Sequence, residues 1–164
     1  MELIREVSEL DIKWKDDSSY LMALALETVL DGHSVLVFCN SRRDCERNAE
    51  FLAQKIGQIV QFDPDKTRAS DDVKPKVLKA QSILMSQVLK NDRAFQIDIQ
   101  EQLSRTSANL DHLLKMTLLS AVAYHNSNLT MDERDIIESG FKEGHIRVIF
   151  CTPTLAAGVN LPGE

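Results

Sequence analysis

The sequence predicts an α/β domain in which helices flank a mainly parallel sheet. Two apolar runs, 34–39 and 147–152, are rich in β-branched residues and are typical of strands buried on both faces. A shorter run, 121–125, predicts a third strand. Segments of helical period separate the runs, and this alternation of strand and helix is typical of parallel strands joined by right-handed crossovers.

Helices are predicted on both sides of the first strand. From Ser18, apolar residues recur at helical spacing until Gly32, which ends the helix. After the strand, Ser41 and Asp44 have the spacing of a capping box and begin a second helix. The apolar stripe of that helix consists of Cys45, Ala49, Leu52 and Ile56.

The middle of the chain predicts a loop followed by helices. Residues 62–76 are polar, include two prolines and show no period, so we predict a mobile loop with the role of a linker. Helices are expected over 77–89, around 95–103 and over 110–118. Nothing in these helices has catalytic spacing.

The end of the chain returns to the alternating pattern. Thr130 and Glu133 have the spacing of a second capping box, which begins a helix that ends at Gly144. At the other end of the chain, residues 2–7 predict an edge strand.

Composition limits the classes of function. The 164 residues fit one domain, and no apolar run reaches the roughly 18 residues of a membrane span. The start of the chain lacks a signal peptide, so we expect an intracellular protein without a membrane partner. The cysteines and histidines lack zinc spacing, so no metal site is predicted. The net charge of −6 predicts weak nucleic-acid binding by the isolated chain.

Polar clusters follow all three predicted strands, at 40–43, 125–128 and 152–154. Ligands of open α/β sheets bind outside the carboxyl ends of the strands, so these clusters predict one composite ligand surface. Hydroxyls, amides, helix-start N–H groups and arginines suit phosphate oxygens. The alternatives are that Ser41 only caps a helix and that Arg42 is only a solvated charge. The sequence has no G-x-x-x-x-G-K-[ST] loop, so we expect no binding of Mg-ATP by this chain alone and no catalytic residue.

The polar clusters resemble motifs of the superfamily 2 helicases. Residues 152–162, T-P-T-L-A-A-G-V-N-L-P, are similar to motif V in the form used by DNA-repair helicases. Residues 34–46 resemble motif IV, and residues 124–134 resemble the motif between them. Residues 103–118 are similar to the corresponding segment of the polymerase theta type of helicase domain. The similarity extends over residues 2–162.

The resemblance implies that residues 1–164 form the second RecA-like domain of a helicase. Such domains contact one single strand, and the resemblance assigns nucleic-acid contacts to Ser41, Arg42, Thr152 and Thr154. It places Gly158 and Asn160 at the nucleotide. ATP with Mg would then bind only together with the first RecA-like domain, which is the expected partner within the parent chain.

The sequence departs from the family pattern at two places. The pattern has a small residue and glycine where this chain has Ser127 and Asn128, and asparagine tolerates the left-handed backbone that the turn is expected to need. Motif VI and its arginines are absent, so we expect a fragment cut from a larger protein before that motif.

The resulting hypothesis is a fragment of an ATP-dependent DNA helicase that acts in nuclear DNA repair and binds single-stranded DNA. Two alternatives stay open. The parent protein could be an RNA helicase of the same superfamily, because backbone contacts scarcely separate DNA from RNA. The chain could also be a non-catalytic interaction module, which its acidic balance favours.

Overall fold

The computed structural model describes residues 17–66, 68, 71–72, 74–89, 93–106 and 112–153, without the side chains of 17–20, 93, 95–96 and 106. The helices are α2 (Asp17–Leu30), α3 (Arg42–Val60), α4 (Lys74–Ile83), the π-helix η1 (Leu84–Val88), α5 (Arg93–Thr106), α6 (His112–Leu118) and α7 (Met131–Lys142). The strands are β1 (Val35–Phe38), β2 (Val122–His125) and β3 (Val148–Cys151). The predicted edge strand at 2–7 lies outside the described residues.

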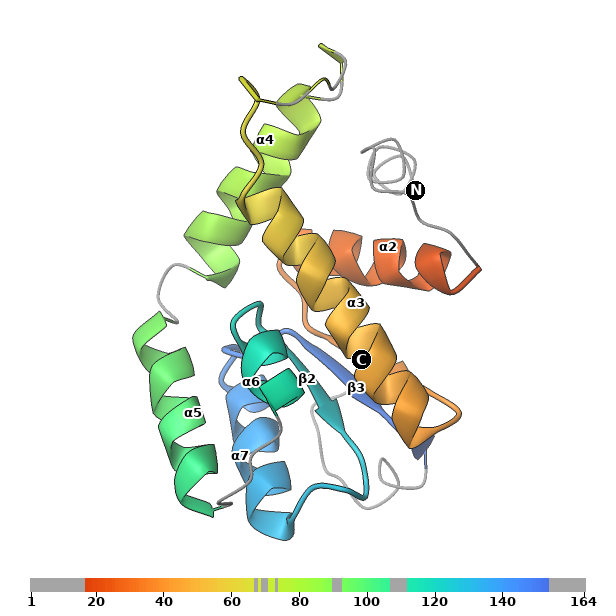
Figure 1. The fold of residues 1–164 in the computed structure, drawn as a ribbon, viewed down its shortest axis with the longest axis vertical. Helices are drawn as coiled ribbons and strands as arrows, with labels where there is room; N and C mark the ends of the chain where they lie inside the picture. Colours follow the sequence, from red (N-terminus) through yellow and green to blue (C-terminus); the bar gives the residue numbers. More distant parts are fainter. Residues whose placement is uncertain are drawn as a thin grey trace.

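The three strands form a parallel sheet in the order β1-β3-β2, with β3 in the centre. Four of the described helices pack against its strands: α2 on β1, α3 on β2 and β3, and both α6 and α7 on β2. Figure 1 shows α5 beside α7, while α4 extends away from the sheet. The predicted α/β fold with a parallel sheet is therefore confirmed.

The first strand is less buried than its apolar sequence predicts. Val35 and Leu36 are half-buried, and Phe38 is 55% exposed. Within the described sheet, both β1 and β2 pair on one side only, with β3, but β2 is covered by α3, α6 and α7, whereas β1 packs mainly against α2. All four residues of β2 and of β3 are buried, so the expectation of a strand covered on both faces holds for β3 and not for β1.

Polar caps begin two of the helices as predicted. Ser41 Oγ accepts a hydrogen bond from the Asp44 backbone N–H at 3.1 Å and caps α3. Thr130 and Glu133 form a complete capping box at α7, in which each side chain accepts from the backbone N–H of the other residue. Because these bonds satisfy N–H groups that lack partners within the helix, both starts are defined by local sequence.

Helix α4 begins at Lys74, three residues earlier than predicted and inside the segment assigned to a loop. Pro75 does not prevent this, because the first turn of a helix makes no use of the missing N–H and tolerates the fixed φ of proline. The mobility of the remaining loop stays a prediction.

The core is continuous from the sheet into the helices. The predicted stripe of α3 is buried, and Tyr124 and Phe150 from the sheet are each at most 1% exposed. Helices α5 and α7 approach closely at Gly140, where an added Cβ would lie 3.1 Å from Ile99 Cδ1 and 2.9 Å from Ile146 Cδ1. Among the described helices, none has the length and apolar character that crossing a membrane requires.

Candidate nucleic-acid interface

The carboxyl ends of the three strands lie at one level of the sheet. Cys151 at the end of β3 is in register with Phe38 of β1 on one side and with His125 of β2 on the other. The ladder continues one residue further, because the Cys39 N–H donates to the Cys151 carbonyl at 2.8 Å. The polar residues that follow each strand therefore emerge at the same edge, as predicted from the parallel topology.

The start of α3, which follows β1, and the loop after β2 meet at this edge. Arg42 Nη1 donates hydrogen bonds to Asn128 Oδ1 at 2.9 Å and to Ser127 Oγ at 3.2 Å. All three side chains are exposed. Arg42 is thus neither a freely solvated charge nor a helix cap, and its guanidinium is held by two neutral acceptors.

Glu46, one turn further along α3, forms hydrogen bonds to the same loop. Its Oε1 atom accepts from Asn126 Nδ2 at 3.2 Å and from Asn128 Nδ2 at 3.4 Å. The buried Asn126 side chain also accepts from the Asn128 backbone N–H at 3.0 Å. Glu46 was not predicted to belong to the site, because nothing local in the sequence pairs it with a loop 80 positions away.

The loop turns without a left-handed residue. Among the described residues, Ala121 is the non-glycine position with positive φ, at 60°. The expectation that Asn128 adopts a left-handed backbone is therefore wrong. The residue contributes through its side chain, and the Asn126–Asn128 bond stabilises the turn as asparagines commonly do.

The predicted contact residues divide into two groups. Ser41 is exposed and its hydroxyl already caps α3, while Thr152 is half-buried directly after β3. Together with Arg42, these two residues occupy the carboxyl edge. Thr154, Gly158 and Asn160 lie outside the described residues, so their assignment remains a prediction.

Cysteines form the layer directly beneath this edge. Cys39, Cys45 and Cys151 are all free and buried. A hydrogen bond from Cys45 lowers the pKa of Cys39 to about 7, against the opposing effect of burial and with the help of a second donor, Asn48 Nδ2 at 3.6 Å. The same bond, with burial, raises the pKa of Cys45. Burial raises the pKa of Cys151 to about 11.

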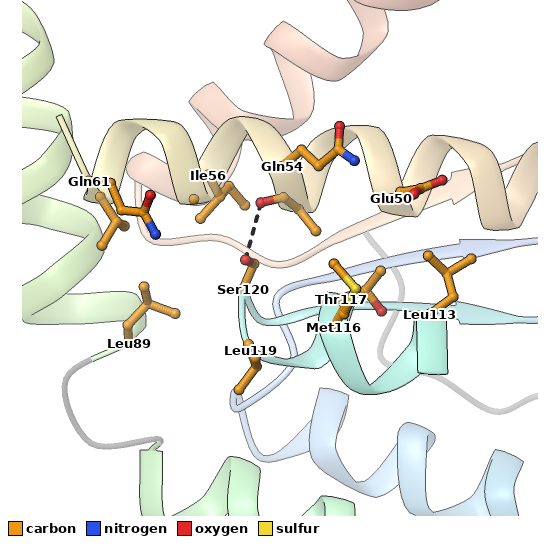
Figure 2. A pocket seen from close by; sticks show the side chains of 13 residues that line it. Glu50, Gln54, Ile56, Gln61, Leu89, Leu113, Met116, Thr117, Leu119 and Ser120 are labelled. Carbon is orange, nitrogen blue, oxygen red and sulfur yellow. Dashed lines mark hydrogen bonds between the residues drawn. The ribbon is translucent and has the colours of Figure 1, made fainter. Parts of the chain in front are cut away.

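A separate hollow of about 320 Å³ lies between α3 and α6 (Figure 2). Its lining includes Ile56, Leu113 and Leu119, and the Ser120 hydroxyl donates to the Ala53 carbonyl at 3.2 Å on its wall. No lining residue is basic. This hollow is therefore unsuited to a phosphate backbone, unlike the carboxyl edge of the sheet.

Comparison with known proteins identifies the family. Residues 76–163 match the family described as helicase conserved C-terminal domain. The chain is 37% identical over 164 residues to mouse DNA polymerase theta, covering 100% of this chain and 6% of that protein. It is 34% identical over 150 residues to human Helicase POLQ-like, covering 92% of this chain and 11% of that protein.

An archaeal protein is also similar. The ATP-dependent DNA helicase Hel308 of Methanocella arvoryzae is 31% identical over 142 residues, which cover 87% of this chain and 16% of that protein. The chain therefore spans between 6% and 16% of the length of these three relatives. With its parallel sheet and the match over residues 76–163, the chain belongs to the helicase conserved C-terminal domain family and is homologous to regions of DNA polymerase theta and the POLQ-like helicases.

Proposed function

We propose that this chain is the second RecA-like domain of an ATP-dependent DNA helicase that acts in DNA repair in the nucleus. The names of the similar proteins support the DNA substrate and the ATP dependence. The observation that carries the proposal is the common level of the three strand ends, which gathers cationic, hydroxyl and amide groups at one edge.

In this proposal the carboxyl edge binds the backbone of single-stranded DNA. Arg42 supplies the charge, Ser41 and Thr152 supply hydroxyls, and Thr154 extends the same set by its place in the motif. Hydroxyl and guanidinium groups suit phosphate oxygens and carry no sequence information, so binding should be independent of base sequence. Because the net charge is −6, affinity depends on these local groups and should be weak.

The ATP site of the parent helicase would lie between this domain and another one. Gly158 and Asn160 are assigned to the nucleotide by the motif, and glycine there would permit close backbone approach. The phosphate loop and the acids that hold Mg would come from the first RecA-like domain. Closure of the two domains on ATP and reopening after hydrolysis would then move the strand stepwise.

The decisive measurement is fluorescence anisotropy of labelled single-stranded DNA titrated with the chain over a salt series. Arg42→Ala and Thr152→Ala should each weaken binding, and the salt dependence should become shallower for Arg42→Ala. Arg105→Ala, an exposed arginine of α5, is the matched control and should bind as the wild type does. If both Arg42→Ala and Thr152→Ala bind DNA as tightly as wild type, the proposal is contradicted.

A parallel ATPase assay tests whether this domain needs the first RecA-like domain to hydrolyse ATP. The chain alone should show no ATP hydrolysis above background, because its sequence contains no phosphate loop. Robust hydrolysis that depends on this chain would contradict the assignment to a second RecA-like domain.

The same titration, repeated with labelled single-stranded RNA, distinguishes two other functions. RNA binding that requires the 2′-hydroxyl would favour an RNA helicase. An absence of binding to either nucleic acid at low salt would favour a non-catalytic interaction module, for which the acidic balance is the supporting observation.

A further inference from the structure

We propose that Ser127 and Asn128 are positioning residues that hold the Arg42 guanidinium ready for a phosphate of the bound strand. The inference rests on the proposed single-strand binding. It adds to that function two residues outside the set of predicted contacts, at the positions where the sequence departs from the family pattern.

The Arg42 guanidinium contacts the loop through only one of its nitrogens. Both hydrogen bonds to the loop use the same nitrogen, Nη1, which lies 2.9 Å from Asn128 Oδ1 and 3.2 Å from Ser127 Oγ. A guanidinium has five N–H donors in a planar fork. Within the described residues, Nε and Nη2 make no hydrogen bond, so that side of the fork remains for an anion.

The orientation of Asn128 is set by groups on both sides. Its Oδ1 atom accepts from Arg42, and its Nδ2 atom donates to Glu46 Oε1 at 3.4 Å. A reversed carboxamide would place its donor against the arginine and its acceptor against the carboxylate. Asn126 strengthens this arrangement, because its Oδ1 accepts from the Asn128 N–H and its Nδ2 donates to Glu46.

The partners of Arg42 leave its charge available. Ser127 and Asn128 are neutral, and among the described residues no carboxylate lies within ion-pair distance of the guanidinium. The amide of Asn128 stands between Arg42 and Glu46 and makes one hydrogen bond to each of them. The loop therefore fixes the direction of the positive charge without cancelling it.

Holding Arg42 in place should increase affinity for the strand. A free arginine side chain loses much rotamer freedom when it binds a phosphate, whereas one already held loses less. Arg42, Ser127 and Asn128 are all exposed, so substitutions at these positions should not disturb the core.

The test is a double-mutant cycle read by anisotropy with labelled single-stranded DNA at low salt. The four proteins are the wild-type chain, the Ser127→Ala/Asn128→Ala double variant, Arg42→Ala, and the triple variant. We expect the loop double variant to bind about 3- to 10-fold more weakly than wild type. In the Arg42→Ala background the same two substitutions should change affinity by less than about 2-fold.

Gln102→Ala is the matched control. Gln102 is an exposed amide on α5 that donates to Asp98 Oδ2 at 2.9 Å, so the variant loses a comparable surface hydrogen bond away from the carboxyl edge. It should bind DNA as wild type does. Equal melting temperatures of the variants would show that changes in binding do not reflect unfolding.

The other outcomes overturn the inference in distinguishable ways. Equal losses with and without Arg42 would mean that the loop acts by itself, and an unchanged affinity of the loop double variant would mean that Arg42 needs no positioning. If Thr152→Ala weakens binding while Arg42→Ala does not, this inference fails and the proposed function survives. If the wild-type chain does not bind at all, both fail together.

Discussion

His125 and Glu138 join the end of β2 to α7, with 2.9 Å between His125 Nε2 and Glu138 Oε1. The histidine side chain is 3% exposed and the carboxylate 20%, so the bond is largely shielded from water. The sequence placed His125 in one of the polar clusters of the predicted ligand surface, with a polar strand end as the alternative. The structure makes His125 a buried anchor directly before the loop that contacts Arg42.

Removal of the carboxylate should destabilise the fold. Glu138→Ala leaves a buried imidazole nitrogen without its partner, which should lower the free energy of unfolding by about 1–3 kcal/mol. Glu138→Gln retains a hydrogen-bonding side chain of the same size and should lose less. Urea denaturation of the three proteins measures both differences, and equal stability of wild type and Glu138→Ala would contradict the structural role of the bond.

The capping box of α7 gives a second prediction. Thr130→Ala removes the acceptor for the Glu133 N–H, so the free energy of unfolding should fall by about 1 kcal/mol. Thr130→Ser should behave as wild type. Thr28→Ala is the control, because the Thr28 hydroxyl donates to the Leu24 carbonyl inside α2 and removing such a bond costs little. A loss as large for Thr28→Ala as for Thr130→Ala in urea denaturation would contradict the capping argument.

Much of the fold could be predicted because it depends on local sequence. Ser41 and Thr130 begin their helices through bonds to residues three positions away, and Gly32 and Gly144 end theirs with positive φ of 95° and 82°. The common edge of the strands follows from parallel topology alone. For these features, pattern and structure agree.

Other features depend on packing between distant segments and left no local signal. The partners of Arg42 lie 85 and 86 positions away, so no spacing rule indicates them. Ala121 has a φ of 60°, although alanine gains nothing from that region, and its carbonyl accepts from the Arg147 N–H at 2.8 Å. The exposure of Phe38 depends on which helices cover β1, and the sequence of β1 does not contain this information.

Two glycines in helices should respond in opposite directions to alanine. A Cβ at Gly57 in α3 would meet nothing within 4 Å, so Gly57→Ala should stabilise the fold by about 0.5–1 kcal/mol through helix propensity. A Cβ at Gly140 would lie 2.9 Å from Ile146 Cδ1 and 3.1 Å from Ile99 Cδ1. Because both isoleucines are buried, this crowding should cost about 1–3 kcal/mol and outweigh the gain in propensity.

Thermal and urea unfolding of the two glycine variants and of wild type measure these stability differences. Gly57→Ala should raise the melting temperature and Gly140→Ala should lower it. A stabilised Gly140→Ala would mean that α5 and α7 separate more easily than their packing indicates.

The buried thiol of Cys151 predicts a loss of stability at alkaline pH. Burial raises its pKa from 9.0 to about 11, so above pH 9 the unfolded chain releases a proton that the folded protein keeps. The contribution of this group is complete below pH 9 and is lost as pH rises towards 11, with a slope of up to about 1.4 kcal/mol per pH unit. Cys151→Ala should make the slope shallower by this amount, and Cys45, whose pKa is also raised, should account for alkaline slope that remains. Val148→Ala, a buried truncation in the same strand without a titratable group, should keep the full slope. Urea denaturation in reducing buffer between pH 8 and 10.5 measures the three slopes, and identical slopes for wild type and Cys151→Ala would show that Cys151 ionises as readily in the folded protein as in the unfolded chain.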